Sequence, residues 1–140
     1  MAGKITPQQE YRLPTEAEWE YTARAGTTGS LYGDLDTLGY WSGNSGDKTH
    51  DVKGKQANAW GLYDMLGNVS EWCSDWYLNY PTLSVIDPSS PASSSATSRV
   101  FRGGAYYDDS GRVRAAFRNG NPPGNRFSGL GFRVTLSSVR

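Results

Sequence analysis

The apolar and polar residues of this chain follow a helical period in one stretch near its start. There Trp19 and Ala23, four residues apart, are expected to form the inner edge of a helix. Thr15 and Glu18 make a capping box at its beginning, and Gly26 is expected to end it. The side chains that this helix is predicted to turn toward water are Glu16, Glu20 and Arg24. The sequence predicts no other helix.

The remaining apolar residues stand in short runs, which favour brief extended segments. Residues 11–13 are expected to be extended, because a following proline excludes helical backbone. Residues 27–58 are interpreted as loops that contain one strand-like pair, Tyr40 and Trp41. The Ser- and Pro-rich residues 77–98 are interpreted as a surface excursion. Further short, buried strands are predicted at residues 100–101, 113, 115–116 and 132–134.

Large apolar side chains are densest in residues 60–76, and a core built on four tryptophans is expected: Trp19, Trp60, Trp72 and Trp76. The single cysteine, Cys73, is predicted to be a small buried apolar residue, and it excludes an internal disulfide. With 17 Gly and 13% aromatic residues, the chain is predicted to be one loop-rich α+β domain with short strands. The domain is expected over residues 11–140, after a lead-in at residues 1–10.

Charge is unevenly divided, although the net charge is zero. Residues 1–98 carry 6 basic against 12 acidic residues, whereas residues 99–140 carry 8 arginines against Asp108 and Asp109. A basic segment of this kind suits either nucleic acid or carboxylates of the same chain. Because the arginines stand singly, internal ion pairs are favoured and no nucleic-acid partner is predicted. No apolar run approaches the roughly 18 residues of a membrane span, so no span is predicted.

Two stretches carry candidate chemistry. Residues 99–134 mix turn-forming residues with exposed-type aromatics such as Tyr106 and Phe117, which is typical of a binding surface, although these two side chains could also fill core space. An oxygen-only site for Ca²⁺ is expected at Asp64, Gly67, Val69 and Glu71. The alternative for the two carboxylates is ordinary hydrogen bonding and capping. His50 lacks a second His or Cys nearby, so it is interpreted as a loop residue rather than a metal ligand.

Four ordered motifs resemble the formylglycine-generating enzyme (sulfatase-modifying factor) family: YRLPTEAEWEY at 11–21, WGLYDMLGN at 60–68 with EW at 71–72, RGG at 102–104, and GFR at 131–133. The resemblance implies a C-type lectin-like fold, here N-terminally shortened because only ten residues precede its first motif. It also places the family's second calcium site on the four residues named above. The enzymes hold copper with two cysteines after the Gly-Gly pair. Here no cysteine follows Gly104, so no copper is expected and the chain is predicted not to be an enzyme.

The C-terminal segment is similar to the variable region of proteins diversified by retroelements. In that branch a frame of arginines and glycines encloses positions that vary and bind ligand. The positions that the resemblance assigns to ligand binding are Tyr106, Tyr107, Asp108, Asp109, Gly111, Arg112, Phe117, Asn119, Gly120, Asn121, Phe127, Ser128 and Gly129. The predicted function is therefore a non-catalytic ligand- or receptor-binding domain. Its expected partner is a protein or other macromolecule at a cell or virion surface, and an oligomer is left open. The alternatives are an oxidase relative without its copper cysteines and an accessory domain with one fixed partner.

Overall fold

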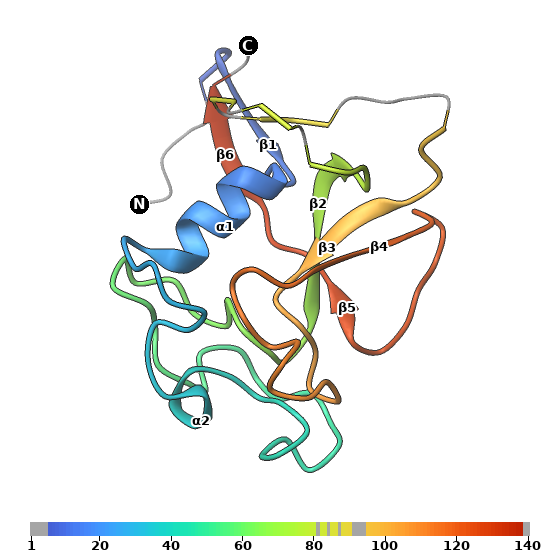
Figure 1. Cartoon of the computed structure of the whole chain (residues 1–140). Coiled ribbons are helices and arrows are strands. Elements are labelled where there is room, and N and C mark those ends of the chain that lie inside the picture. The colour runs from blue at the N-terminus through green and yellow to red at the C-terminus, as the bar shows by residue number, and fades with distance from the viewer. Residues whose placement is uncertain (1–5, 81, 84, 87, 91–94, 139–140) are drawn as a thin grey trace.

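The structure, a computed structural model, describes residues 6–80, 82–83, 85–86, 88–90 and 95–138 (Figure 1). Loops make up most of the chain, and short elements anchor them. The elements are β1 (Gln9–Arg12), α1 (Glu16–Arg24), α2 (Leu35–Leu38), β2 (Ser70–Trp76), β3 (Arg99–Arg102), β4 (Arg118–Asn121), β5 (Leu130–Gly131) and β6 (Thr135–Ser138). No helix in the described residues is long and apolar enough to cross a membrane.

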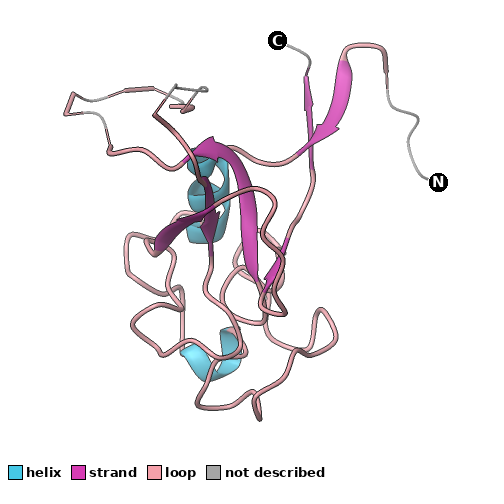
Figure 2. Ribbon diagram, turned by 90° about the vertical axis from the view of Figure 1, so that its right-hand side faces the viewer, coloured by secondary structure: helices cyan, strands magenta, loops and turns pink. Residues whose placement is uncertain are grey.

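Four strands form the central sheet in the order β4-β3-β2-β5. The β3 strand is antiparallel to both of its neighbours, whereas β5 runs parallel to β2. The first and last strands, β1 and β6, form a separate antiparallel ribbon in which Tyr11 lies opposite Leu136. This ribbon projects away from the rest of the molecule (Figure 2).

The start of α1 confirms the capping box. The Glu18 amide donates to the Thr15 hydroxyl at 3.1 Å, and the Glu18 carboxylate accepts from the Thr15 amide at 2.8 Å. Both Glu18 oxygens also accept from the Arg12 guanidinium at 2.7 Å. This arginine lowers the pKa of Glu18 to about 2. The helix ends, as predicted, where Ala25 takes a left-handed conformation before Gly26.

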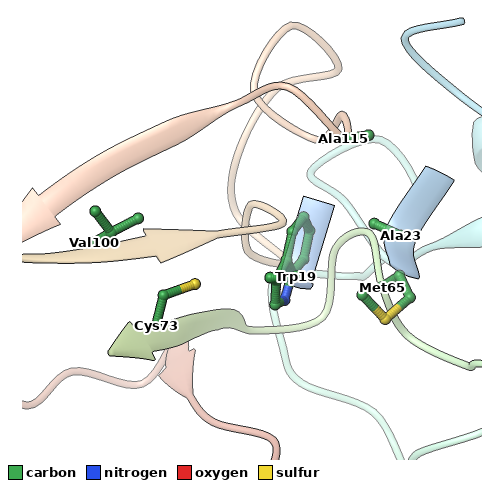
Figure 3. Packing of buried hydrophobic residues seen from close by; sticks show 6 residues of the cluster. All are labelled: Trp19, Ala23, Met65, Cys73, Val100 and Ala115. Atoms are coloured by element: carbon green, nitrogen blue, oxygen red, sulfur yellow. The ribbon is translucent and has the colours of Figure 1, made fainter. Parts of the chain in front are cut away.

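The main core cluster joins α1 to the sheet (Figure 3). Trp19 and Ala23 turn inward as the helical period predicts, and both are fully buried. They pack with Met65, Cys73, Val100 and Ala115. The buried position of Cys73 confirms its predicted role. A second cluster lies around α2 and consists of Leu35, Leu38, Leu66 and Val113.

The structure corrects several expectations in the N-terminal half. Glu16 is buried instead of facing water, because it pairs with arginines that come from the C-terminal segment. The sequence missed α2, a single turn whose Asp34 side chain caps the Asp36 amide. Tyr40 and Trp41 form no strand. Of the four tryptophans expected to build the core, only Trp19 is fully buried; Trp60 is 47% exposed, and Trp72 and Trp76 are half-buried.

Strand positions needed further correction. The β1 strand begins at Gln9, inside the expected lead-in, of which residues 1–5 lie outside the described part of the chain. The predicted strand at residues 100–101 is confirmed as part of β3. The strands predicted at 113 and 115–116 are wrong, because Val113 and Ala115 are buried but lie in loops. The prediction for residues 132–134 is also wrong, because they lie between β5 and β6 and leave Phe132 and Val134 exposed. The longest strand, β2, and the polar β4 were not predicted, because pairing with β3 outweighs their local sequence.

Candidate ligand-binding surface

A buried ion-pair network fixes the C-terminal segment to the rest of the fold. The fully buried Arg102 donates to Glu16 at 3.0 Å, to Glu20, and to the Ala115 carbonyl at 3.0 Å. Arg118 binds both oxygens of Glu16 at 2.7 and 2.8 Å. The prediction that these arginines pair with carboxylates of the acidic half is therefore confirmed.

A second pair secures the end of the segment. Arg133 donates to both Glu71 oxygens at 2.6 and 2.7 Å, and Trp19 Nε1 donates to Glu71 Oε2 at 2.7 Å. Glu71 thus links the final strands, the sheet and the core tryptophan. With both ends anchored, residues 103–117 and 122–129 can form loops on either side of β4 without losing their position on the scaffold.

The backbone turns sharply into the first of these loops at Gly103 and Gly104, whose φ angles are 94° and 75°. A Cβ on Gly103 would lie 3.1 Å from Trp19 Cζ2, and one on Gly104 would lie 3.0 Å from Val113 Cα. Both glycines are therefore required by conformation and by space. Ala105, which follows them, is still buried, and the chain reaches the surface at Tyr106 and Tyr107.

Two predicted ligand residues shape this loop from within. Asp108 Oδ2 accepts from the Ala105 amide at 2.9 Å, and Asp109 Oδ1 accepts from the Gly111 amide at 2.9 Å. Arg112 lies 3.4 Å from Asp108 and is 58% exposed at its side chain. The two aspartates thus hold the turn, while Arg112 remains available to solvent.

The two ends of the predicted variable segment meet at a pair of tyrosines. The rings of Tyr106 and Tyr107 pack edge to face, with centroids 4.9 Å apart. The Tyr106 hydroxyl lies 3.0 Å from Ser128 Oγ. The Tyr107 ring lies over the buried Gly129, and burial raises the pKa of its hydroxyl. Residues some twenty positions apart in sequence therefore form one continuous surface.

This surface continues across the face of the sheet that points away from α1. Phe127 packs edge to face on Phe101 at 6.3 Å, and Phe101 packs on Trp72 at 6.0 Å. Asn119 lies opposite Phe101 in the pairing of β4 with β3, so their side chains share a face. Asn121, two residues further, shares it too.

Three predicted positions are less available than expected. Gly129 is buried beneath Tyr107, and a Cβ on Gly120 would lie 2.5 Å from the Tyr77 ring. Phe117 is half-buried, so its side chain contributes to packing as well as to the surface. The two glycines are covered by tyrosine rings from distant parts of the chain, and the residues next to each glycine in sequence give no sign of this.

The sequence also missed residues that support the surface. The Tyr106 amide donates to the Asn68 carbonyl at 2.9 Å, and the Tyr106 carbonyl accepts from Ser45 Oγ at 2.9 Å. Phe101 and Trp72 lie beneath Phe127. Among these supporting residues, only Phe101 could have been recognised from the local sequence, because it alternates in β3 with the inward-facing Val100.

All four residues expected to hold Ca²⁺ line one cavity of about 380 Å³. Asp64 Oδ2 accepts from the Lys53 amide at 2.7 Å, whereas its buried Oδ1 has no hydrogen-bond partner among the described residues. The Glu71 oxygens are already bonded to Arg133 and Trp19. The unpartnered Asp64 oxygen fits a hard cation, while Glu71 is the least available of the four donors.

Neither the cysteine nor the histidine makes a reactive site. Burial raises the pKa of the Cys73 thiol well above its usual range. His50 stacks on Tyr40 at 3.8 Å, and its Nε2 lies 2.7 Å from the Ser45 carbonyl. The part of the chain that the structure describes contains no group of three His, Cys, Asp or Glu residues able to hold a metal ion.

The short-stranded α+β scaffold, the Gly-Gly turn and the buried Arg–Glu pairs agree with one family. Residues 1–138 match the family model of the sulfatase-modifying factor enzyme 1-like domain, and the chain belongs to that family. It is 42% identical over 144 residues to the formylglycine-generating enzyme of Streptomyces coelicolor, which covers 87% of this chain and 45% of that protein.

Other relatives carry names that describe different activities, or none. The serine/threonine-protein kinase pkn1 of Chlamydia pneumoniae is 40% identical over 126 residues, which cover 87% of this chain and 20% of the kinase. The mouse protein named inactive C-alpha-formylglycine-generating enzyme 2 is 33% identical over 159 residues, covering 99% of this chain and 47% of that protein. The chain thus spans less than half the length of these relatives, and the family includes enzymes and an inactive member.

Solved structures confirm the fold. The Treponema denticola variable protein 1 superposes with a TM-score of 0.83 at 40% identity, covering 91% of this chain and 48% of that one. PvdO from Pseudomonas aeruginosa also gives 0.83, at 29% identity, covering 94% of this chain and 54% of that one. The predicted loop-rich, C-type lectin-like fold of the formylglycine-generating type is therefore correct.

Proposed function

We propose that this chain is a non-catalytic ligand-binding domain whose C-terminal segment presents a diversified contact surface. The observation that carries the proposal is the contact between the Tyr106–Tyr107 pair and residues 128–129, which unites both ends of the segment. Tyrosine offers a large contact area with few rotatable bonds, and the neighbouring Ser and Asn side chains offer adaptable hydrogen bonds. Phe127 extends this surface as a third aromatic anchor.

The chemistry of the segment argues against the oxidase alternative. The residues after Gly104 include no cysteine, and Cys73 is held in the core with its pKa raised by burial. A buried, protonated thiol is neither a copper ligand nor a nucleophile. The copper-dependent reaction of a cysteine-containing peptide, monitored by loss of its thiol, is therefore expected to proceed no faster with this protein than without it.

The proposed partner is a protein or another macromolecule at a cell or virion surface. A standard interface buries about 800 Å² per partner, which requires most of the exposed loop residues and not one pocket. The variable protein of Treponema denticola supports this choice, since it superposes over nearly all of this chain. Arg112 and Asp109, both exposed, would supply polar contacts around the aromatic centre.

The test of diversification is deep sequencing of the 3′ end of the gene from a source population. Substitutions are expected at Tyr106, Tyr107, Asn119, Asn121 and Phe127, with Gly103, Gly104 and the paired arginines unchanged. Gly129 is expected to vary only together with Tyr107, which covers it, and Gly120 is expected to stay constant because Tyr77, which covers it, lies outside the segment. An invariant segment would exclude a diversified surface.

A second candidate is an accessory domain with one fixed partner. Its support is the kinase relative, in which the matching region is one fifth of a larger protein. This candidate predicts an invariant C-terminal segment in the same sequencing experiment. The sequencing experiment therefore distinguishes a diversified binding domain from an accessory domain with a fixed partner.

We also propose that the cavity beside Asp64 takes a structural Ca²⁺ ion. The supporting observation is the buried Asp64 Oδ1, which lacks a hydrogen-bond partner among the described residues and would gain one ligand contact. Calcium at 100 times its Kd would add about 2.7 kcal/mol to the unfolding free energy. Thermal unfolding with and without Ca²⁺ is expected to show this gain in the wild type and in Asp51→Asn, but not in Asp64→Asn. Equal melting temperatures of the wild type in both conditions would contradict the proposal.

A further inference from the structure

The ribbon formed by β1 and β6, together with residues 131–134 that lead into β6, has an unusual distribution of side chains. Along residues 131–138 exposure alternates strictly, and the exposed positions include the apolar Phe132, Val134 and Leu136, whereas Arg133 and Ser137 are half-buried. Tyr11 lies opposite Leu136 and is also exposed. A strand on the surface of a soluble domain normally shows the reverse arrangement.

Two polar residues on the opposite side from Leu136, Arg133 and Ser137, are held there by hydrogen bonds. Arg133 binds Glu71, and Ser137 Oγ accepts from Arg12 at 2.9 Å. A shift of register that moved the apolar row inward would break these bonds and expose Glu71. The outward position of Phe132, Val134 and Leu136, the apolar row, is therefore part of the fold.

The apolar row and Tyr11 together are large enough to form the centre of an interface. The exposed fractions are 68% for Phe132, 57% for Val134, 45% for Leu136 and 59% for Tyr11. At roughly 150–250 Å² for a whole aromatic side chain, these four residues expose on the order of 400 Å² of apolar surface. That is about half of the roughly 800 Å² that each partner buries in a standard interface. The flanking Gln9 and Ser138 would supply a polar rim.

The absence of charge on this face indicates what can cover it. Strand alternation puts Tyr11 and Gln9 on the face of Leu136, while Glu10 and Arg12 lie on the opposite face. Two copies of this face can therefore meet without facing like charges, and the chain as a whole has no net charge. A two-fold axis would place the apolar row of one copy against the same row of the other.

We propose that the β1–β6 ribbon and the residues that lead into β6 form a dimerisation element, in which two copies of this chain pack face to face through Tyr11, Phe132, Val134 and Leu136. The ribbon lies at the top of Figure 1, while the loop that follows β3 lies in the lower half of the molecule. The dimer thus leaves the loop that carries Tyr106 and Tyr107 free in both copies, whereas Phe132 also lines the cavity beside Asp64. Such a dimer is independent of the proposed function, but it would give that function two linked sites and higher avidity.

Sedimentation equilibrium of the 140-residue chain over a range of concentrations tests this proposal. The wild type is expected to reach twice the 15.3 kDa chain mass at the higher concentrations. Val134→Lys and Leu136→Lys each place an unpaired ammonium group from both copies in the interface, so the dimer Kd is expected to rise at least about 100-fold. The matched control is Ile86→Lys, an exposed apolar residue in the excursion, which is expected to leave the Kd unchanged.

Circular dichroism and unfolding curves establish that each variant is folded. If a lysine variant unfolds, Val134→Ser provides the milder test, with a smaller rise in Kd expected. A wild type that remains monomeric at every concentration would overturn the proposal. So would dimerisation that is equally strong in the Val134, Leu136 and Ile86 variants.

Discussion

The Tyr107 ring occupies the space in which a side chain on Gly129 would stand: a Cβ on that glycine would lie 2.4 Å from Tyr107 Cε1. The two positions belong to different loops, yet they cannot both carry a side chain in the present arrangement. Diversity at one of them is therefore conditional on the other. Their coupling can be measured without knowing the ligand.

Gly129→Ala is expected to lower the unfolding free energy by roughly 1 kcal/mol, because Tyr107 must move or overlap with the new methyl group. In a Tyr107→Ser background the same change is expected to have almost no effect, which gives a coupling within the usual range of about 0.5–3 kcal/mol. Denaturant unfolding of the four proteins measures it. Gly124→Ala is the control, since nothing lies within 4 Å of a Cβ at that position. Equal effects in both backgrounds would show that the tyrosine is not the obstacle.

Arg102 is expected to be the arginine on which stability depends most. Arg102→Met removes the fully buried guanidinium and leaves Glu16 and Glu20 without part of their compensation, which should reduce the unfolding free energy by about 3–5 kcal/mol. Arg112→Met, at an exposed position, is expected to change it by no more than about 0.5 kcal/mol. Urea unfolding compares the two. A small loss in the first variant would mean that this network does not hold the segment in place.

Glu18 makes stability depend on acid pH. Arg12 lowers its pKa from 4.5 to about 2 in the folded protein, so the stabilisation is complete above 4.5 and is lost as the pH falls toward 2. Glu18→Gln is expected to make the unfolding free energy fall less steeply across this interval. Arg12→Gln, which removes the cause of the shift, should flatten the curve in a similar way. Parallel curves for the wild type and both variants would contradict this assignment.

Cys73 offers a probe of global opening. Because burial raises the pKa of its thiol, a thiol-alkylating reagent is expected not to label the native protein, even at alkaline pH that ionises an exposed cysteine. Labelling should become rapid only in denaturant, with a midpoint equal to that of unfolding. Mass spectrometry of the alkylated chain gives both values. Rapid labelling of the native protein would place the thiol near solvent instead.

The sequence by itself determined features that depend on neighbouring residues. The helix α1 follows from the Trp19–Ala23 spacing and from the capping box at Thr15 and Glu18, because these interactions span only three or four residues. Separation of charge between the two parts of the chain predicted internal ion pairs, although not which arginine binds which carboxylate.

Only the tertiary structure decided what depends on distant contacts. Glu16 is buried because Arg102 and Arg118 reach it from more than eighty residues away in sequence, and helical periodicity alone places it in water. Gly129 is covered by a tyrosine of another loop. Residues 132–134 were predicted to form a buried strand, but Phe132 and Val134 turn outward because Arg133 turns inward to bind Glu71. A local pattern specifies periodicity, whereas the partner across space specifies which side is buried.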